Sequence, residues 1–558
     1  MAPPTPSQRY LSTRGGSYDF SFESVVLKGL ASDGGLFIPE EIPTLPQNWQ
    51  TTWRDLSFQD LALEVFSLYI AEDELPRDDL KEMVERSYGT FRAKDITPLK
   101  RLNGGDGKEL WLLELFHGPT FAFKDVALQF VGNLFEYFLV RRNKGKKEGE
   151  EREHLTVIGA TSGDTGSAAI YGLRGKKDVS VFIMHPKEKV SPIQEAQMTT
   201  VLDKNVHNLA VKGTFDDCQD IVKALFADPD TNAQFKLAAV NSINWARILA
   251  QITYYFHSYF ALLRKTGSEP QVRFVVPTGN FGDILAGFFA TRMGLPTEKL
   301  VVATNANDIL HRFWKTGYYE KQPVHGREAE GGLEKDGVKA HEEGVKETLS
   351  PAMDILVSSN FERLLWFLAF DTSTAQDAKD RREDAGAKVK GWLNQLKSQG
   401  GFGVGKEVLE KAKALFESER VSDEQTIETI KSIHSQQLPQ ANGTTNGHAA
   451  PATTGTEHDG HYILDPHSAI GVAATLRSIK SNPGVEHVAL ATAHPAKFSH
   501  AVELALKDVE GFSFETVLPE QFQGMLEMEK RVTGVDNDWK SVREVIVKEV
   551  EEELKEKR

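Results

Sequence analysis

The sequence predicts an α/β protein built on open, mostly parallel sheets. Two stretches carry this prediction, because each reads as a strand, a glycine loop, a helix and a second strand. The first contains LTVIGA (155–160), TSGDTG, SAAIYGLRG and VSVFIMHP (179–186). The second contains VRFVVPT (272–278), GNFGD, ILAGFFATRMG and LVVAT (300–304). A late strand, VALATA (488–493), follows the helix-like DPHSAIGVAATLRSI.

The rest of the chain divides around this pattern. Residues 1–95 read as a mostly helical segment, in which SFESVVLKGLASDGG ends in glycine and FQDLALEVFSLYI has apolar residues at helical spacing. Residues 96–434 are the expected α/β core, with a polar insertion near 325–347. Residues 435–460 have the composition of a disordered linker, where the sequon Asn442-Gly443-Thr444 is read as incidental. Residues 461–558 would complete the core and end in a helical tail.

Composition limits the classes of function. The 558 residues allow two or three domains of roughly 100–200 residues. No run of about 18 apolar residues is present, so no membrane span is expected. The single cysteine, Cys218, excludes an internal disulfide and favours a reducing compartment such as the cytoplasm. The net charge of −15 argues against a nucleic-acid partner.

Lys124 is the first candidate for chemistry. It lies in ELFHGPTFAFKDVALQF (114–130), with Phe121 and Phe123 before it and Val126 after it. Apolar surroundings disfavour the ammonium form of lysine and leave a nucleophilic amine that can form an imine. The alternative is an exposed lysine at the start of an amphipathic helix, which is the usual state of a lysine.

Two glycine loops open helices directly after strands. ATSGDTGSAA (160–169) contains Gly163 and Gly166, and VVPTGNFGDILAG (275–287) contains Gly279 and Gly282. Such loops turn backbone N–H groups and the positive end of the helix dipole towards an anion, either a carboxylate or a phosphate. An ordinary glycine turn remains the alternative for the first loop. Neither loop reads G-x-G-x-x-G or ends in Gly-Lys-Ser/Thr, so dinucleotide and nucleotide-hydrolase sites are disfavoured.

Further candidates lie beside strand ends. Thr492, in LATAHPAKF (490–498), could hydrogen-bond a heterocycle nitrogen or simply cap its strand. Lys187 and Lys189, and likewise Asn241 and Arg247, could hold a substrate phosphate or belong to solvated surface. No metal site is expected, because His341-Glu342-Glu343 lacks the second histidine of the zinc-protease helix, and no G-x-S-x-G elbow is present.

Taken together, the motifs resemble those of threonine synthases, a family of fold type II enzymes that use pyridoxal 5′-phosphate (PLP) and are related to the tryptophan synthase β-subunit. The resemblance extends through most of the chain and is carried by YLSTRGG, ASDGGLFIPEEIP, HGPTFAFKD, GATSGDTGSAA and PTGNFGDILAG, in that order. The chain is most similar to the longer fungal branch. The fold implied is two open α/β domains with the active site between them.

The resemblance also implies roles for individual residues. Lys124 would bind PLP as a Schiff base and move protons. Gly279, Asn280, Phe281, Gly282 and the adjacent Asp283 would hold the PLP phosphate, and Thr492 would meet the pyridine nitrogen. The substrate carboxylate would lie against the loop formed by Thr161, Ser162, Gly163, Asp164 and Thr165.

The implied reaction converts O-phospho-L-homoserine and water to L-threonine and phosphate, with PLP as the electron sink. The enzyme would work as a monomer or homodimer. Two alternatives remain. A threonine-synthase-like phospho-lyase would release a 2-keto acid from a related substrate, and a non-catalytic PLP-binding protein would release nothing. Lys124 beside an intact substrate loop disfavours the second.

Overall fold

The computed structural model describes residues 8–16, 18–105, 107–147, 149–322, 339–340, 344–436, 438, 456–458 and 460–556. Most of the insertion expected near 325–347 lies outside these ranges, and so does most of the linker expected at 435–460, including the sequon at Asn442.

A six-stranded sheet forms one half of the molecule, in the order β15-β10-β9-β18-β4-β3. Its strands are β3 (Leu99–Asn103), β4 (Glu109–Glu114), β9 (Val272–Pro277), β10 (Thr297–Thr304), β15 (Phe416–Arg420) and β18 (Glu486–Ala491). All neighbours are parallel except the edge pair β3 and β4. The four central parallel strands β10, β9, β18 and β4 are buried along most of their length, as expected for a sheet covered on both faces.

A five-stranded sheet forms the other half, in the order β19-β7-β6-β5-β8. Its strands are β5 (Leu155–Ala160), β6 (Val179–Pro186), β7 (Val206–Val211), β8 (Leu237–Ala239) and β19 (Thr533–Val535). Every neighbouring pair is parallel.

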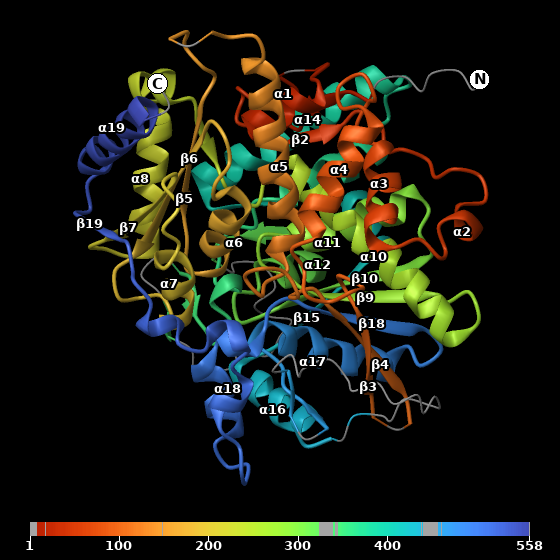
Figure 1. The fold of residues 1–558 in the computed structure, drawn as a ribbon. Coiled ribbons are helices and arrows are strands. Elements are labelled where there is room, and N and C mark those ends of the chain that lie inside the picture. Colours follow the sequence, from red (N-terminus) through yellow and green to blue (C-terminus); the bar gives the residue numbers. More distant parts are fainter. Residues whose placement is uncertain are drawn as a thin grey trace.

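The C-terminal segment contributes to both sheets. β18 lies inside the six-stranded sheet, whereas β19 is added to the edge of the five-stranded sheet. The last helix, α19 (Trp539–Glu556), packs beside α8 (Phe215–Ala227) against one face of that sheet (Figure 1). The two sheets are therefore tied together by the end of the chain.

The N-terminal segment is helical but also contains a small sheet. β1 (Tyr10–Ser12) pairs antiparallel with β2 (Phe37–Pro39). The helices are α1 (Phe22–Lys28), α2 (Trp49–Thr52), α3 (Phe58–Ser67) and α4 (Arg77–Tyr88). The helix expected over SFESVVLKGLASDGG ends early, because Gly29 has a φ of 68° and its N–H closes the last turn on Val25.

Two long helices form the centre. α5 (Lys124–Asn143) packs against α6 (Asp164–Leu173), α4 and α10 (Trp245–Thr266), as the middle of Figure 1 shows for α4, α5 and α6. Both α5 and α10 are buried along most of their length, because apolar residues surround nearly the whole helix axis. Their N-terminal turns, which carry Lys124 and Arg247, are therefore held rigidly inside the protein.

The remaining elements complete the layers. The other helices of the first three hundred residues are α7 (Pro192–Thr199), α9 (Pro229–Phe235) and α11 (Gly282–Met293). Those that follow are α12 (Ile309–Thr316), α13 (Phe361–Asp371), α14 (Ala378–Gln399), α15 (Lys406–Leu415), α16 (Asp423–His434), α17 (Pro466–Ser481) and α18 (Ser499–Leu506). Short strands pair as β11 (Tyr318–Glu320) with β14 (Gly401–Gly403), β12 (Lys339–Ala340) with β13 (Lys346–Glu347), and β16 (Glu457–His458) with β17 (His461–Tyr462). The 3₁₀ turns are η1 (Pro351–Met353), η2 (Pro495–Lys497), η3 (Phe514–Val517), η4 (Glu520–Phe522) and η5 (Met525–Glu527).

The expected strand–loop–helix–strand units are confirmed. β5 and β6 have the predicted limits, and the glycine loops are followed by α6 and α11. Both helices begin inside the loops, at Asp164 and Gly282, so each loop is itself a helix N-terminus.

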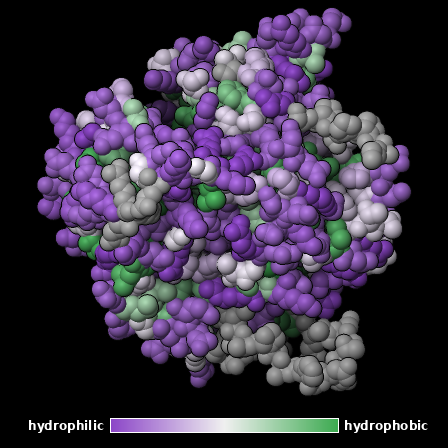
Figure 2. Space-filling view, turned by 45° about the horizontal axis from the view of Figure 1, so that its top comes forward, coloured by the Kyte–Doolittle hydropathy of each residue, from purple (hydrophilic) through white to green (hydrophobic). Residues whose placement is uncertain are grey.

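Apolar side chains gather inside the molecule. The face drawn in Figure 2 is mostly hydrophilic, with hydrophobic residues in small separate patches. Among the described residues, no helix is long and apolar enough to cross a membrane.

Candidate active site

The segment before Lys124 is fixed against the strand end that carries Thr492. The Phe123 N–H donates to the Thr492 carbonyl (2.8 Å), and the His494 N–H donates to the Phe121 carbonyl (3.1 Å). Phe121 has a φ of 59°, and the chain turns there into α5. Lys124 and Thr492 are thereby placed side by side, although 368 positions separate them in the sequence.

Lys124 is a buried lysine with a long contact to a carboxylate. Its side chain is 10% exposed, and its Nζ lies 3.6 Å from Oδ2 of Asp164. Burial lowers the pKa of Lys124; Asp164 opposes this effect, and the positive charges of Lys497 and Arg247 add to it. The amine is therefore more nucleophilic than that of an exposed lysine.

The loop at 161–166 is built to present backbone N–H groups. The Thr161 hydroxyl accepts from the N–H groups of Gly163 (2.9 Å) and Gly166 (2.8 Å) and so closes the loop from inside. Across the described ranges, the N–H groups of Ser162, Asp164 and Thr165 have no acceptor.

Gly163 is required at its position. Its φ is 144°, and a Cβ there would lie 2.5–2.6 Å from the carboxamide atoms of Gln194. The same Gln194 donates to Oδ1 of Asp164 (2.8 Å). Gln194 therefore supports the loop from behind and holds the Asp164 carboxylate.

The loop at 279–283 presents a second set of N–H groups. No acceptor for the N–H groups of residues 279–283 is present in the described parts of the chain, and they stand at the N-terminus of α11. Phe281 has a φ of 65°, which turns the chain into the helix. A Cβ on Gly279 would lie 2.9 Å from the Ala352 carbonyl oxygen. Glycine therefore allows the loop to approach η1.

A buried network holds this loop from the other side. Ser358 donates to the Gly279 carbonyl (2.6 Å), and Asn360 donates to the Asn280 carbonyl (3.1 Å). Arg363, fully buried, donates to Asn360 Oδ1 (2.5 Å) and to the Phe37 carbonyl in β2 (2.8 Å). The N-terminal sheet thus reaches the loop through two side chains.

Asp283 faces the core. Its Oδ1 accepts from the hydroxyls of Tyr254 (2.5 Å) and Tyr255 (3.0 Å) in α10. Burial raises the pKa of Asp283 to about 6, against the lowering effect of these two bonds. Residue 283 therefore offers its N–H to the loop, while its carboxyl group joins α11 to α10.

Arg247, in the first turn of α10, is a buried cation with unused donors. It is 5% exposed, and its Nε and Nη1 have no hydrogen-bond partner in the described structure. Burial lowers its pKa to about 10. The following residues of α10, Ile248 and Gln251, lie within 4.0 Å of a Cβ placed on Gly282. The start of α10 therefore lies next to the 279–283 loop, with Arg247 close enough to lower the pKa of Lys124.

Thr492 is supported by the N-terminus of α17. Its N–H donates to the Ser468 hydroxyl (3.0 Å), which in turn donates to Asp465. Nε2 of His467 accepts from the Ala352 N–H (3.2 Å), so its Nδ1 carries the proton and donates to Asp465 (2.9 Å). Asp465, the N-cap residue of α17, thus orients both Thr492 (through Ser468) and η1 (through His467).

Other predicted site residues lie further from this arrangement. Lys187 and Lys189 are exposed after β6, and Lys187 contacts Glu188 (3.6 Å). Asn241 is half-buried and accepts from the Ile243 N–H (3.2 Å). Among the described contacts, none joins these three residues to Lys124 or to either loop.

Sequence reasoning missed several residues that build the site, namely Gln194, Asn360, Arg363, Asp465, Ser468 and Lys497. Lys497 lies in the HPAKF motif, five residues after Thr492. The described residues contain no cluster of histidine, cysteine or acidic side chains that could hold a metal ion.

Comparison with known proteins places this site in a family. Family models match residues 9–88 (Threonine synthase N terminus), 91–352 (Pyridoxal-phosphate dependent enzyme) and 468–546 (Threonine synthase, C-terminal). The threonine synthase of Schizosaccharomyces pombe is 55% identical over 524 residues, which cover 93% of this chain and 94% of that protein. The chain belongs to the threonine synthase family.

Solved threonine synthases have the same fold. The yeast enzyme is 51% identical, with a TM-score of 0.87 over 98% of this chain and 100% of that chain. The PLP-bound enzyme from Brucella melitensis is 38% identical, with a TM-score of 0.79 over 97% of this chain and 99% of that chain. The chain therefore has the fold type II architecture of the PLP-dependent enzymes, as the sequence predicts.

The residues present fit PLP. A buried amine, a set of unpaired N–H groups at a helix N-terminus and a hydroxyl at a strand end are the groups that an aldehyde, a phosphate and a pyridine nitrogen require. The site therefore contains the groups that PLP requires, in agreement with the match to the family model for pyridoxal-phosphate dependent enzymes.

Proposed function

We propose that this chain is a PLP-dependent threonine synthase that converts O-phospho-L-homoserine and water to L-threonine and phosphate. The observation that carries the proposal is the buried Lys124 amine beside the 161–165 loop, in a chain whose 279–283 loop presents a second set of unpaired N–H groups. The sequence identity to threonine synthases over nearly the full chain supports the same reaction.

The proposal assigns the cofactor contacts as follows. Lys124 bonds the cofactor covalently, and the N–H groups of Gly279, Asn280, Phe281, Gly282 and Asp283 hold its phosphate at the start of α11. The Thr492 hydroxyl meets the pyridine nitrogen. A hydroxyl, unlike a carboxylate, does not keep that nitrogen protonated.

The substrate contacts divide into two anion sites. The loop of Thr161, Ser162, Gly163, Asp164 and Thr165 holds the carboxylate, with N–H groups rather than the Thr161 hydroxyl as donors. Arg247 is the favoured partner of the substrate phosphate, because its buried guanidinium has two unused nitrogens. Asn241, Lys187 and Lys189 are assigned to the approach of the substrate.

In the reaction, Lys124 moves the protons. When bound, PLP supplies the electron sink for the charge that develops at Cα. The Lys124 amine takes the proton from Cα, and a second proton leaves Cβ before phosphate departs from Cγ. Water then adds at Cβ, and protons return to Cγ and Cα. Burial lowers the pKa of the Lys124 amine, which favours the neutral form that can act as a base.

We further assign the protein to the cytoplasm, as a monomer or homodimer without a nucleic-acid partner. Its single cysteine supports the cytoplasm, and its net charge of −15 supports the absence of a nucleic-acid partner. The domain limits proposed are residues 1–95, the core at 96–434, and its completion at 461–558.

The test is product analysis with purified protein and O-phospho-L-homoserine. Threonine and phosphate in equal amounts support the proposal, whereas 2-oxobutyrate and phosphate indicate the phospho-lyase and no phosphate indicates a non-catalytic protein. Lys124→Ala is expected to abolish turnover. Lys413→Ala, at an exposed position of α15, is the matched control and should keep full activity.

A further inference from the structure

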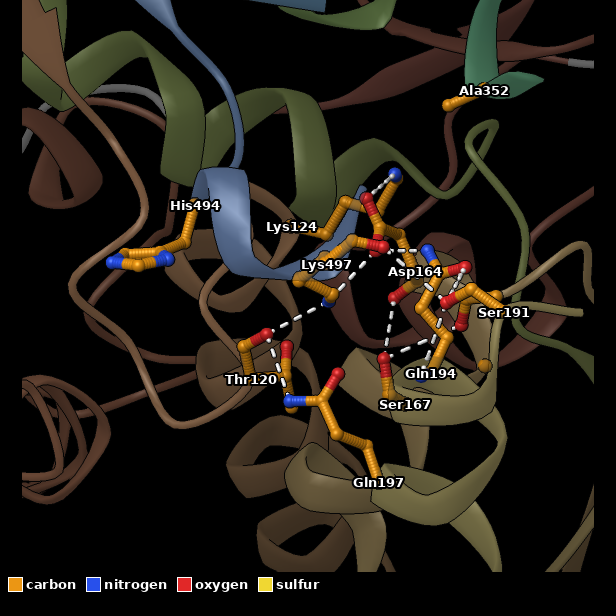
Figure 3. Close-up of polar contacts among 12 residues, drawn as sticks. Thr120, Lys124, Asp164, Ser167, Ser191, Gln194, Gln197, Ala352, His494 and Lys497 are labelled. Carbon is orange, nitrogen blue, oxygen red and sulfur yellow. Dashed lines mark hydrogen bonds and ion pairs between the residues drawn. The ribbon is translucent and has the colours of Figure 1, made fainter. Parts of the chain in front are cut away.

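Lys497 is a second buried lysine at the same site. It ends η2, its side chain is fully buried, and its Nζ lies 2.7 Å from Oδ1 of Asp164. The same Nζ donates to the Thr120 carbonyl (2.8 Å), to which Gln197 also donates (3.2 Å). Figure 3 shows the Lys497 side chain lying between Thr120 and Asp164. A buried ammonium group held by one carboxylate and one carbonyl has little freedom to move.

Asp164 lies between two lysines. Its Oδ1 contacts Lys497 at 2.7 Å, and its Oδ2 faces Lys124 at 3.6 Å (Figure 3). Gln194 also donates to Oδ1 (2.8 Å), so one oxygen of the carboxylate has two partners and the other has the distant amine. Asp164 is therefore drawn towards Lys497 and away from Lys124.

The charged groups around Lys124 come from several elements. Asp164 belongs to α6, Arg247 to α10 and Lys497 to η2, and Asp125, next to Lys124 in α5, is influenced by Lys497 as well. Asp125 itself is held by the Thr120 N–H (2.8 Å) and hydroxyl (2.7 Å). Lys497 is thus the cation that balances the negative charge nearest to Lys124.

We propose that Lys497 is a positioning residue for Lys124. Lys497 binds Asp164 so tightly that the Lys124 amine remains free to react and the 161–165 loop can accept a carboxylate. Without Lys497, the Asp164 carboxylate would form a close ion pair with Lys124 and would repel an anionic substrate at the loop. The proposal rests on the proposed function only in taking Lys124 as the residue that reacts with PLP.

Electrostatics supports the same assignment. Burial would raise the pKa of Asp164, but the ammonium groups of Lys497 and Lys124 outweigh it and hold this pKa below the usual range. Burial lowers the pKa of Lys124, and the charge of Lys497 lowers it further. Removing the Lys497 charge should therefore favour the protonated, unreactive form of Lys124.

The test measures the reactivity of Lys124 in the full chain freed of cofactor. PLP is added at a series of pH values, the product is trapped with borohydride, and labelled Lys124 is quantified by peptide mass spectrometry. The readout is the pH at which the labelling rate is half-maximal. This midpoint follows the amine pKa, whereas a change in phosphate affinity alters the rate at all pH values.

Three variants decide the outcome. Lys497→Met is expected to raise the midpoint by about one pH unit, which slows labelling at pH 7 about tenfold. Asp164→Asn is expected to lower the midpoint, because the attraction on the ammonium form is lost. The double variant is expected to return the midpoint to the wild-type value or below it. Lys176→Met removes a lysine that contacts Asn133 (2.5 Å) and Glu136 (3.3 Å) away from the site, and it should leave the profile unchanged.

Each result is decisive. If the midpoint is the same in Lys497→Met and wild type, Lys497 is only a structural residue and the inference fails. If Lys497→Met does not fold, Asp164→Asn takes its place as the test. An unchanged midpoint in Asp164→Asn would show that the carboxylate bound by Lys497 does not affect Lys124, and the inference would fail. If wild-type Lys124 is not labelled at all, the proposed function fails instead.

Discussion

Replacing Arg247 by methionine should make the protein more stable and less active. Burial lowers the pKa of the guanidinium from its usual range to about 10. A cation whose pKa falls on folding destabilises the folded state at every pH below the folded value, and the cost disappears only above the unfolded value. The difference between the folded and unfolded pKa values corresponds to about 3 kcal/mol at pH 7. Methionine fills similar space without a charge, so Arg247→Met should recover much of this cost.

The expected thermal shift follows from the chain length. An unfolding entropy of about 2.1 cal/mol/K per residue gives about 1.2 kcal/mol/K for 558 residues, so 3 kcal/mol raises Tm by about 2–3 °C. Activity should move the other way. Losing a charge-assisted contact of about 1.5–3 kcal/mol should raise KM for O-phospho-L-homoserine about 10–100-fold.

The assay combines calorimetry and kinetics on the holoenzyme, in which we propose that the cofactor phosphate occupies the 279–283 loop. Inorganic phosphate at about 100 times its Kd should stabilise the wild type by about 2.7 kcal/mol and the variant much less. Arg247→Lys keeps the charge and is the matched control. If Arg247→Met is less stable than wild type, or if phosphate stabilises both proteins equally, Arg247 is not an unpaired cation that binds the substrate phosphate.

Two further predictions concern the loops. Asp283→Asn should gain stability relative to wild type as pH rises from about 4 to 7, by up to about 3 kcal/mol. The reason is that the folded pKa of about 6 exceeds the unfolded value of 3.8, so ionisation of Asp283 disfavours the folded state over this range. If Tm, measured from pH 4 to 8, changed in parallel for both proteins, the prediction would be wrong. Gly163→Ala should strain the substrate loop by about 1–3 kcal/mol and lower kcat/KM at least about tenfold while the circular dichroism spectrum is retained; full activity would show that the loop does not need this conformation.

The elements around the site were predictable because their signals are local. An apolar run such as LTVIGA forms a strand, and the glycines after it allow the turn into α6, whatever the rest of the chain does. The antiparallel edge strand β3, the pair β1–β2 and the added strand β19 were not predicted, because short strands are recognisable only by the partner with which they pair.

Site residues divide in the same way. Lys124 and the two loops stand out in sequence because aromatic neighbours and glycine spacing mark them. The direction of the Asp283 carboxyl group, the unused donors of Arg247 and the burial of Lys497 depend on helices that pack from elsewhere.

The sequence alone determined the strand–loop–helix–strand units around the site, the two N–H-rich loops and the choice of Lys124 as the candidate lysine, since each depends on residues within a few positions of one another. Tertiary structure decided which charges meet. Asp164 lies between Lys124 and Lys497 only because residues 121–123 pair with the strand end at 492–494. Whether a lysine is solvated or buried beside a carboxylate depends on such distant contacts, because desolvation and Coulomb energies are set by distances in space, not by positions along the chain.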